Sequence, residues 1–283
     1  MMREEMPMRN RILDSLARGG GEEWISGEAL SRDFRISRAA VSKHVNSLRG
    51  EGNIIESVPR RGYRLISRAD PWAGDDVREG LRTRILGKKE WIWLKETGST
   101  NQVAAQQALA GAEEGLVVVA RRQNEGRGSK GSRWFCLPGS LSFSVLTKPH
   151  LPPEKLALLP LLAMEACARA VEKGCGIRLE QRAPNDLFLH DRKVVGILAE
   201  SMFHNTELQW SVVGIGVNVN VPSSAIPPEL EGIASSLYAE TKTPFSVTKL
   251  LRCILEELEK ELEKGETPTE YAKKAQARRE DLV

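Results

Sequence analysis

A short glycine-rich segment carries the residue types that hold an oxyanion. Gly126 and Gly128 flank Arg127, and Gly131 and Trp134 follow shortly after. Glycine lets backbone N–H groups approach an oxyanion closely, arginine supplies a permanent cation, and tryptophan offers an aromatic face to a flat ligand. On its own a Gly-Arg-Gly segment is more often a surface turn, so its interpretation depends on the rest of the chain.

Three other short segments carry polar side chains of the kind that small-molecule sites use. Gly98–Asn101 places two hydroxyls and an amide where a helix is predicted to begin, and the first N–H groups of a helix lack partners within it. Pro184–Leu187 contains an asparagine and an aspartate, and Gly214–Asn218 ends in an asparagine. Together with the glycine-rich segment, they favour one binding site assembled from four parts of the chain.

In this order and at these intervals, the four segments resemble those of the biotin protein ligase family, which joins a carboxylic acid to AMP and then to a lysine. The resemblance extends over residues 8–66 and 90–280. It implies an ATP-dependent, AMP-forming enzyme that makes biotinyl-AMP from biotin and ATP with Mg²⁺. The enzyme would then transfer biotin to a lysine of a biotin carboxyl carrier protein. No covalent enzyme intermediate is needed, so the cysteines and histidines require no catalytic role.

The resemblance also implies roles for individual residues. Arg127 and Arg182 are the expected catalytic cations, and Asp186 is the expected partner of Mg²⁺. Lys193 begins a predicted strand whose backbone would pair with the ureido group of biotin. The expected ligand-binding residues are Ser99, Thr100, Asn101, Gln123, Arg127, Gly128, Trp134, Asn185, Asp186, Lys193, Gly196 and Asn218.

Several positions depart from the family pattern. The family signature Lys-Trp-Pro-Asn-Asp is Arg182–Asp186 here, with arginine for lysine and Ala183 for tryptophan. Arginine is longer, planar and forked, so this exchange is not conservative. Ser129 and Ser132 stand where the glycine-rich loop usually has arginines, and Gly98 replaces an aspartate. The alternatives are a weakened ligase, a ligand-sensing regulator with a non-ligating or altered-specificity domain, and a ligase for another acid such as lipoate or octanoate.

The first 66 residues predict a winged helix-turn-helix. Their apolar spacing is helical, Ser26 and Ser37 can act as N-caps, and two strands flank a turn at Pro59–Gly62. Helices are predicted over residues 8–18, 26–34 and 38–49, and strands over residues 53–58 and 62–66.

This segment also carries the net positive charge of the chain. It holds 12 Lys/Arg against 9 Asp/Glu, which accounts for the whole +3. Residues 37–44 resemble the recognition helix of biotin operon repressors, so we expect a repressor that binds operator DNA as a homodimer on paired half-sites. The alternative is a protein-interaction module whose charges are only solvated. The expected DNA-binding residues are Arg38, Ser42, Lys43, Asn46, Arg60 and Arg61, with Arg64 beside them on the wing.

The remaining chain predicts a linker over residues 67–89 and a ligase-like domain over residues 90–283. Mixed helices and strands indicate an α+β fold, and the resemblance implies a biotinyl/lipoyl-transferase-like (class II synthetase-like) domain with a mixed, largely antiparallel sheet. Pro160 should kink or divide a helix over residues 154–172. The Glu256–Glu266 stretch is expected to be a solvated helix face with i,i+4 ion pairs. The SH3-like barrel that usually ends the family's chains is expected to be absent.

Composition predicts a cytoplasmic protein without a membrane span. Hydrophobic residues make up 41% and charged residues 28% of the chain, and no long apolar run occurs. The four cysteines are scattered without metal-ligand spacing, so free thiols in a reducing compartment are expected.

Overall fold

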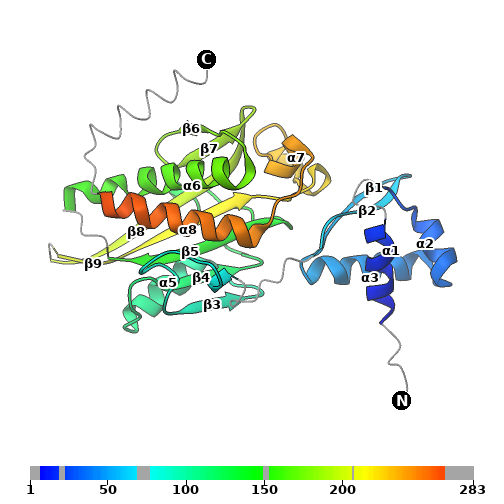
Figure 1. Ribbon diagram of the computed structural model, residues 1–283, viewed down its shortest axis with the longest axis horizontal. Coiled ribbons are helices and arrows are strands. Elements are labelled where there is room, and N and C mark those ends of the chain that lie inside the picture. The colour runs from blue at the N-terminus through cyan, green and yellow to red at the C-terminus, as the bar shows by residue number, and fades with distance from the viewer. Residues whose placement is uncertain (1–6, 19–22, 69–76, 149–152, 206, 265–283) are drawn as a thin grey trace.

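The computed structural model describes residues 7–18, 23–68, 77–148, 153–205 and 207–264. They form a small helical domain with a two-stranded wing and a larger α+β domain, which lie beside one another in Figure 1. This arrangement confirms the predicted fold class. The end of the chain, where the barrel was expected to be missing, lies outside the described residues.

The N-terminal domain is built from three helices and a hairpin, as predicted. Ser26 and Ser37 each accept a hydrogen bond from the backbone N–H three residues on, at 3.0 and 3.1 Å, and these caps fix where the second and third helices begin. Val41, Val45 and Leu48 face inward from the third helix. The elements are α1 (Met8–Arg18), α2 (Gly27–Phe34), α3 (Arg38–Gly50), β1 (Ile54–Val58) and β2 (Gly62–Ser67).

The larger domain contains a seven-stranded sheet in the order β3-β4-β5-β9-β8-β7-β6. β3 and β4 are parallel, and every other neighbouring pair is antiparallel. The sequence pattern predicts five of these strands, at residues 91–94, 116–120, 141–146, 194–200 and 208–219, and misses the short β6 and β7. The strands are β3 (Trp91–Leu94), β4 (Val117–Ala120), β5 (Ser140–Thr147), β6 (Glu180–Arg182), β7 (Asp186–Leu189), β8 (Arg192–His204) and β9 (Glu207–Asn218).

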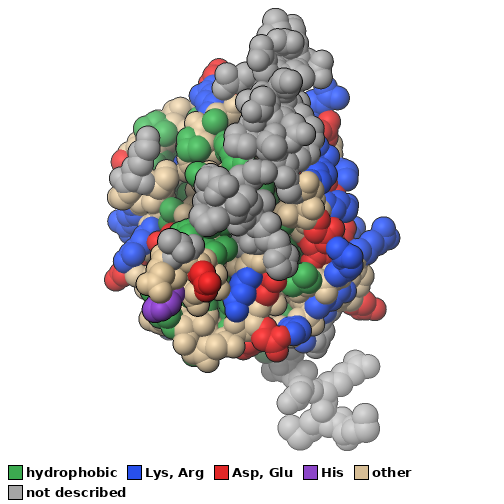
Figure 2. Space-filling view, turned by 90° about the vertical axis from the view of Figure 1, so that its left-hand side faces the viewer, with side chains coloured by type: hydrophobic (Ala, Val, Ile, Leu, Met, Phe, Trp, Pro, Cys, Tyr) green, Lys and Arg blue, Asp and Glu red, His purple; other side chains and the backbone are tan. Residues whose placement is uncertain are grey.

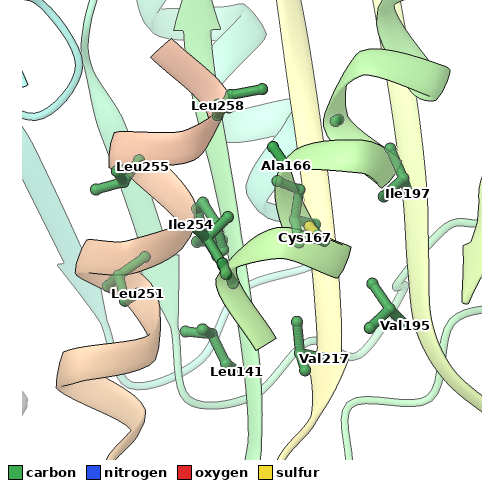
Figure 3. Close-up of a cluster of buried hydrophobic side chains, with 14 of the residues drawn as sticks. Leu141, Ala166, Cys167, Val195, Ile197, Val217, Leu251, Ile254, Leu255 and Leu258 are labelled. Carbon is green, nitrogen blue, oxygen red and sulfur yellow. The ribbon is translucent and has the colours of Figure 1, made fainter. Parts of the chain in front are cut away.

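Helices cover both faces of this sheet. α6 (Leu159–Cys175) and α8 (Val247–Lys264) lie side by side on one face, where Ile254 and Cys167 meet Val217 and Leu141 of the strands (Figure 3). A short 3₁₀ helix ends at Leu158 and α6 follows with Pro160 in its first turn, so the predicted division is confirmed. α5 (Thr100–Leu109) packs against the other face, and the short α7 (Leu237–Thr241) follows β9.

The second half of the expected linker packs into the larger domain. Val77, Leu81 and Leu86 are buried in the same hydrophobic cluster as α6 and α8. Buried apolar side chains of this kind anchor the start of the larger domain well before β3. Of the described helices, none is long and apolar enough to cross a membrane.

The expectation of a solvated face on α8 was wrong for three of its glutamates, although Lys260, Glu263 and Lys264 are exposed. Glu257, Glu259 and Glu261 are 4%, 8% and 1% exposed. Glu259 accepts hydrogen bonds from the backbone N–H groups of residues 84–86 at 2.6 to 2.9 Å, so burial is compensated by partners distant in sequence. The other two carboxylates pair with α6: Glu257 with Lys173 at 2.8 Å and Glu261 with Arg169 at 3.5 Å.

Candidate active site

The start of α5 is held in a buried hydrogen-bond network. Thr100 donates from its backbone N–H and its hydroxyl to Gln123 Oε1, at 2.8 and 3.1 Å. Asn101 donates from Nδ2 to Glu200 Oε2 at 2.7 Å, and its Oδ1 accepts from Ser144 Oγ at 2.6 Å. Because each partner comes from a different element, the polar groups at the head of α5 are fixed in position.

The glycine-rich loop closes on itself as a narrow hairpin. Arg127 and Arg133 pair as an isolated antiparallel bridge, and Gly128 N–H donates to the Ser132 carbonyl at 2.8 Å. Trp134 N–H donates to the Gly126 carbonyl at 2.9 Å. A Cβ at Gly126 would overlap the Trp134 carbonyl, so only glycine allows this closure.

Trp134 lies on a floor of glycines contributed by β8 and β9. A Cβ at Gly196 would lie 2.8 Å from the indole ring, and a Cβ at Gly216 would overlap the ring. The indole N–H is buried and has no hydrogen-bond partner among the described residues. The ring leaves a cavity of only about 40 Å³. A ligand of more than a few atoms therefore has to move the ring, and one that offers an acceptor would satisfy its N–H group.

The Pro184 turn brings an amide and a carboxylate to the edge of this cavity. Asn185 donates from Nδ2 to Ser129 Oγ and to the Ile197 carbonyl, both at 3.0 Å, so it ties the glycine-rich loop to β8. Asp186 and Lys193 form an ion pair of 2.6 Å. The Lys193 ammonium also lies 5.9 Å from the centre of the Trp134 ring. A cation, a carboxylate and an aromatic ring thus meet at one side of the cavity.

The structure brings most of the expected ligand residues together around the cavity. Arg133, Ile197 and Leu198 also line it, as do Ser132, Phe143 and the glycine–isoleucine–glycine run of β9. The expected residues that line it are Ser99, Thr100, Asn101, Gln123, Arg127, Gly128, Trp134, Asn185, Lys193 and Gly196.

Arg182, Asp186 and Asn218 do not line the cavity, although Asp186 pairs with Lys193, which does. The Arg182 guanidinium pairs with Glu180 at 2.7 Å and also with Asp191, and it lies 4.1 Å from the centre of the Phe188 ring. The hydrogen bonds that Arg182 donates to these carboxylates, to Glu180 first, raise the pKa of Arg182. Asn218 is engaged with Ser140 Oγ and with the Ser235 carbonyl, at 3.0 and 2.9 Å.

Sequence reasoning missed Ser144 and Glu200 as supports of the Asn101 amide. Ser140, Ser142 and Ser144 alternate with large apolar residues along β5, and this alternation is the signal that could have located Ser144 on the α5 face. Glu200 lies on β8, and its contact with Asn101 depends on the fold of the whole sheet.

The cysteines do not provide a nucleophile here. Burial raises the pKa of Cys167 and raises that of Cys175 to about 11, so both thiols are protonated near neutral pH. The described residues contain no group of three or more His, Cys, Asp or Glu side chains arranged for a metal ion. Asp186 is a single carboxylate, which suits a Mg²⁺ ion held mainly by nucleotide phosphates.

The expected DNA-binding side chains lie on two surfaces of the N-terminal domain. On α3, Arg38, Lys43 and Asn46 are exposed and Ser42 is half-buried. On the wing, Arg60 and Arg61 are exposed, and the Arg61 guanidinium lies 4.8 Å from the centre of the Trp24 ring.

Arg64, also on the wing, contacts the larger domain. It pairs with Glu56 at 2.6 Å and donates to the Tyr238 hydroxyl of α7 at 2.9 Å, so it joins the wing to the larger domain. Ile54, Ile66 and Tyr238 form a small buried cluster at the same junction.

Comparison with known proteins supports this division of the chain. A sequence model of the biotin/lipoate A/B protein ligase family matches residues 93–218, and one of an HTH domain matches residues 10–64. The bifunctional ligase/repressor BirA of Bacillus subtilis is 37% identical over 218 residues, which cover 77% of this chain and 67% of that protein. The chain belongs to the family of bifunctional ligase/repressors. BirA of Escherichia coli is 30% identical over 213 residues, or 74% and 63% of the two chains.

Solved structures of biotin protein ligases have the same fold as the larger domain of this bifunctional ligase/repressor. The Aquifex aeolicus ligase in complex with biotin and ATP is 32% identical with a TM-score of 0.52, covering 62% of this chain and 71% of that one. The Leishmania major ligase in complex with biotinyl-5-AMP has a TM-score of 0.54 at 23% identity, covering 67% and 81%, and shows the fold alone.

Proposed function

We propose that this bifunctional ligase/repressor activates biotin as biotinyl-AMP in the cavity beneath Trp134 and transfers it to a lysine of a biotin carboxyl carrier protein. A carboxylate oxygen of biotin bonds to the α-phosphorus of ATP, and the bond from that phosphorus to the pyrophosphate oxygen breaks. The lysine amine then attacks the acyl carbon, AMP leaves and the amine loses a proton. Asp186 would contact a Mg²⁺ ion carried with the nucleotide, and the ion would offset phosphate charge when bound.

The observation that carries this proposal is the convergence of all four sequence segments on one cavity. Two anions have to be brought together there, and the cavity wall supplies the cations Arg127, Arg133 and Lys193. Thr100 and Asn101 are held rigidly at its other side, which suits a ring with fixed hydrogen-bonding groups. The similarity to a ligase solved with biotin and ATP supports the choice of acid and nucleotide.

We further propose that the adenylate is the corepressor and that a homodimer binds operator DNA. Each N-terminal domain presents one recognition helix, and two such helices on paired half-sites bind DNA more tightly than one helix on a single half-site. The reaction would take place in the cytoplasm, where ATP and the carrier protein occur. Changing Arg38 and Lys43 together to alanine should weaken DNA binding while adenylate formation is retained. Loss of both activities would indicate misfolding instead.

A second function is favoured by one observation. The cation that replaces the family lysine, Arg182, is engaged by Glu180 and Asp191 outside the cavity, and Ser129 is tied to Asn185. A site altered in this way suits a sensor that binds biotin or another acid without transferring it. The N-terminal domain would then be the output of the sensor.

Calorimetric titration with biotin, followed by ATP·Mg²⁺ and mass spectrometry for biotinyl-AMP, tests the proposal. Biotin binding with adenylate formed supports the ligase, with transfer to a carrier lysine as the next assay. Biotin binding without adenylate supports the sensor. Absence of biotin binding would contradict the proposed biotin ligase and point to a different acid.

A further inference from the structure

A second and much larger cavity lies between the two domains. Its volume is about 610 Å³, within the range of sites that hold a nucleotide-sized ligand. The N-terminal domain contributes the end of α3 and the residues around β1 and the end of β2. The larger domain contributes the segments that follow β3 and β4 and the one that precedes β5. This interdomain cleft shares no lining residue with the cavity beneath Trp134.

The walls of the interdomain cleft carry a strong excess of positive charge. Among the described lining residues, the cations are Arg49 and Arg68 from the N-terminal domain and Lys95, Arg121 and Arg122 from the larger domain, and the one carboxylate is that of Glu96. The chain as a whole is nearly balanced, with 41 Lys/Arg and 38 Asp/Glu. Cations and carboxylates are interspersed on the visible described surface in Figure 2, at the end of the molecule away from the N-terminal domain. Charge of one sign is therefore concentrated in the cleft.

The charge in the cleft is held partly out of water. Burial lowers the pKa of Arg49 and of Arg121, which shows that the surroundings disfavour their charged forms. The Arg49 guanidinium donates to the neutral Ile55 carbonyl at 2.9 and 2.7 Å, and Arg121 donates to the neutral Glu51 carbonyl. The Ile55 carbonyl satisfies N–H groups of Arg49 but does not neutralise its charge.

The carboxylates near the cleft already have hydrogen-bond or ion-pair partners. Glu96 accepts a hydrogen bond from Asn124 at 2.6 Å, and Asp14 pairs with Arg68 at 2.8 Å. In the described part of the chain, no ion pair of 4 Å or less joins Arg49, Lys95 or Arg122 to a carboxylate. An anion in the cleft would compensate these cations.

We propose that the interdomain cleft binds a small phosphate-bearing anion, of the size of a phosphorylated metabolite or nucleotide, at a site distinct from the ligase centre. Guanidinium groups match the oxygens of a phosphate in pairs, and an arginine-rich wall is the usual means of recognising one. Of the expected DNA-binding residues, only Asn46 lines the cleft. A DNA backbone suits the cleft less well, because the recognition helix reads bases from its beginning while the cleft lies at its end, around Arg49 and Gly50.

The position of this site gives it a regulatory consequence. A bound anion would contact Arg49 of α3 and Arg122 of the larger domain at once, and so would favour one arrangement of the two domains. By linkage, the anion and the DNA alter each other's affinity by the same factor. The site is independent of the proposed ligase reaction, because its lining residues and its ligand class do not depend on biotin.

Calorimetric titration of the full chain with inorganic triphosphate tests the proposal. We expect one saturable site per chain, which the double variant Lys95→Gln/Arg122→Gln weakens by about tenfold or more, since two charge-assisted contacts are removed. The matched control is Lys89→Gln/Arg178→Gln. It removes the same charge at exposed positions that pair with Glu113 and Glu172 outside the cleft, and its affinity should change by less than about twofold.

The titration is repeated on Lys193→Gln, a variant of the cavity beneath Trp134, and citrate and a random DNA duplex serve as further probes. Triphosphate binding that persists in Lys193→Gln separates this site from the ligase centre, whether or not biotinyl-AMP forms. Equal thermal melting of both double variants excludes unfolding as the cause of a loss. The proposal is wrong if the unmodified chain shows no saturable site. It is also wrong if both variants lose affinity equally, if citrate binds as tightly as triphosphate, or if the cleft variant loses only DNA binding.

Discussion

Lys193 and Arg182 are two cations close to the Pro184 turn, and their different contacts indicate different roles. The Lys193 ammonium lines the cavity, pairs with Asp186 and lies beside the Trp134 ring. Arg182 is engaged by Glu180 and Asp191 on the outer side of β6. A compact ammonium can follow a phosphate as it changes geometry, so we expect Lys193 to offset charge that develops during adenylation.

Changing Lys193 to Gln should therefore reduce biotinyl-AMP formation by roughly a hundredfold, the scale seen when one charge-stabilising group is removed. Changing Arg182 to Gln should reduce it by less than about threefold, because an exposed ion pair contributes little. The measurement is single-turnover formation of biotinyl-AMP with both substrates saturating. The opposite order of effects would mean that Arg182 turns into the site when ligands bind.

At the scale of elements, the glycine floor of β8 and β9 sets the depth of the ligand site. Gly216→Ala should push the Trp134 ring aside, weaken biotin binding by at least about tenfold and lower the free energy of unfolding by roughly 1–3 kcal/mol. Gly174→Ala is the control, because its Cβ would meet only Cys253 Sγ at 3.8 Å and alanine favours a helix. Tryptophan fluorescence, thermal melting and biotin titration report the three effects. Unchanged biotin affinity in Gly216→Ala would show that ligand does not use this floor.

The packing of α6 against α8 should make stability depend on acidic pH. Burial alone would raise the pKa of Glu257, but hydrogen bonds from Lys173 and Lys260 outweigh it and lower that pKa below its usual 4.5. The carboxylate therefore stabilises the fold above about pH 4.5. That stabilisation is lost as the pH falls through the lowered pKa of the folded protein.

Urea denaturation between pH 3 and pH 7 measures this dependence. Glu257→Gln should be less stable than the unmodified chain at pH 7, and the difference should shrink towards pH 3. A constant difference across that range would show that Glu257 acts through packing alone.

Local signals in the sequence were sufficient to predict most of the helices and strands and most of the residues that line the ligand site. The serine caps fixed the beginnings of α2 and α3, and Pro160 fixed that of α6, because caps and proline act within one turn. The burial of Glu259 could not be predicted, since its partners at residues 84–86 are distant in sequence. The outward position of Arg182 likewise depends on Asp191 across the β7–β8 turn.

At the scale of the whole molecule, a short chain of contacts joins the ligand site to the wing. Asn218 ends β9 and donates to the Ser235 carbonyl, and Tyr238 N–H donates to the Val219 carbonyl at 2.9 Å. The Tyr238 hydroxyl then accepts from Arg64 of the wing. A change at the end of β9 on ligand binding would therefore reach the N-terminal domain through α7.

Tyr238→Phe removes the hydroxyl that accepts from Arg64 and keeps the ring in its cluster with Ile54 and Ile66. We expect DNA affinity without ligand to change little, and the enhancement of DNA affinity by biotinyl-AMP to fall by about threefold to tenfold, within the usual range of a coupling free energy. The measurement is the ratio of dissociation constants with and without biotinyl-AMP, on a duplex selected from a random pool. Thr241→Val, which also removes an α7 hydroxyl but one that bonds within the helix to Leu237, is the control and should leave the ratio unchanged. An unchanged ratio in Tyr238→Phe would place the coupling outside α7, because the hydroxyl is the group through which this helix holds the wing arginine.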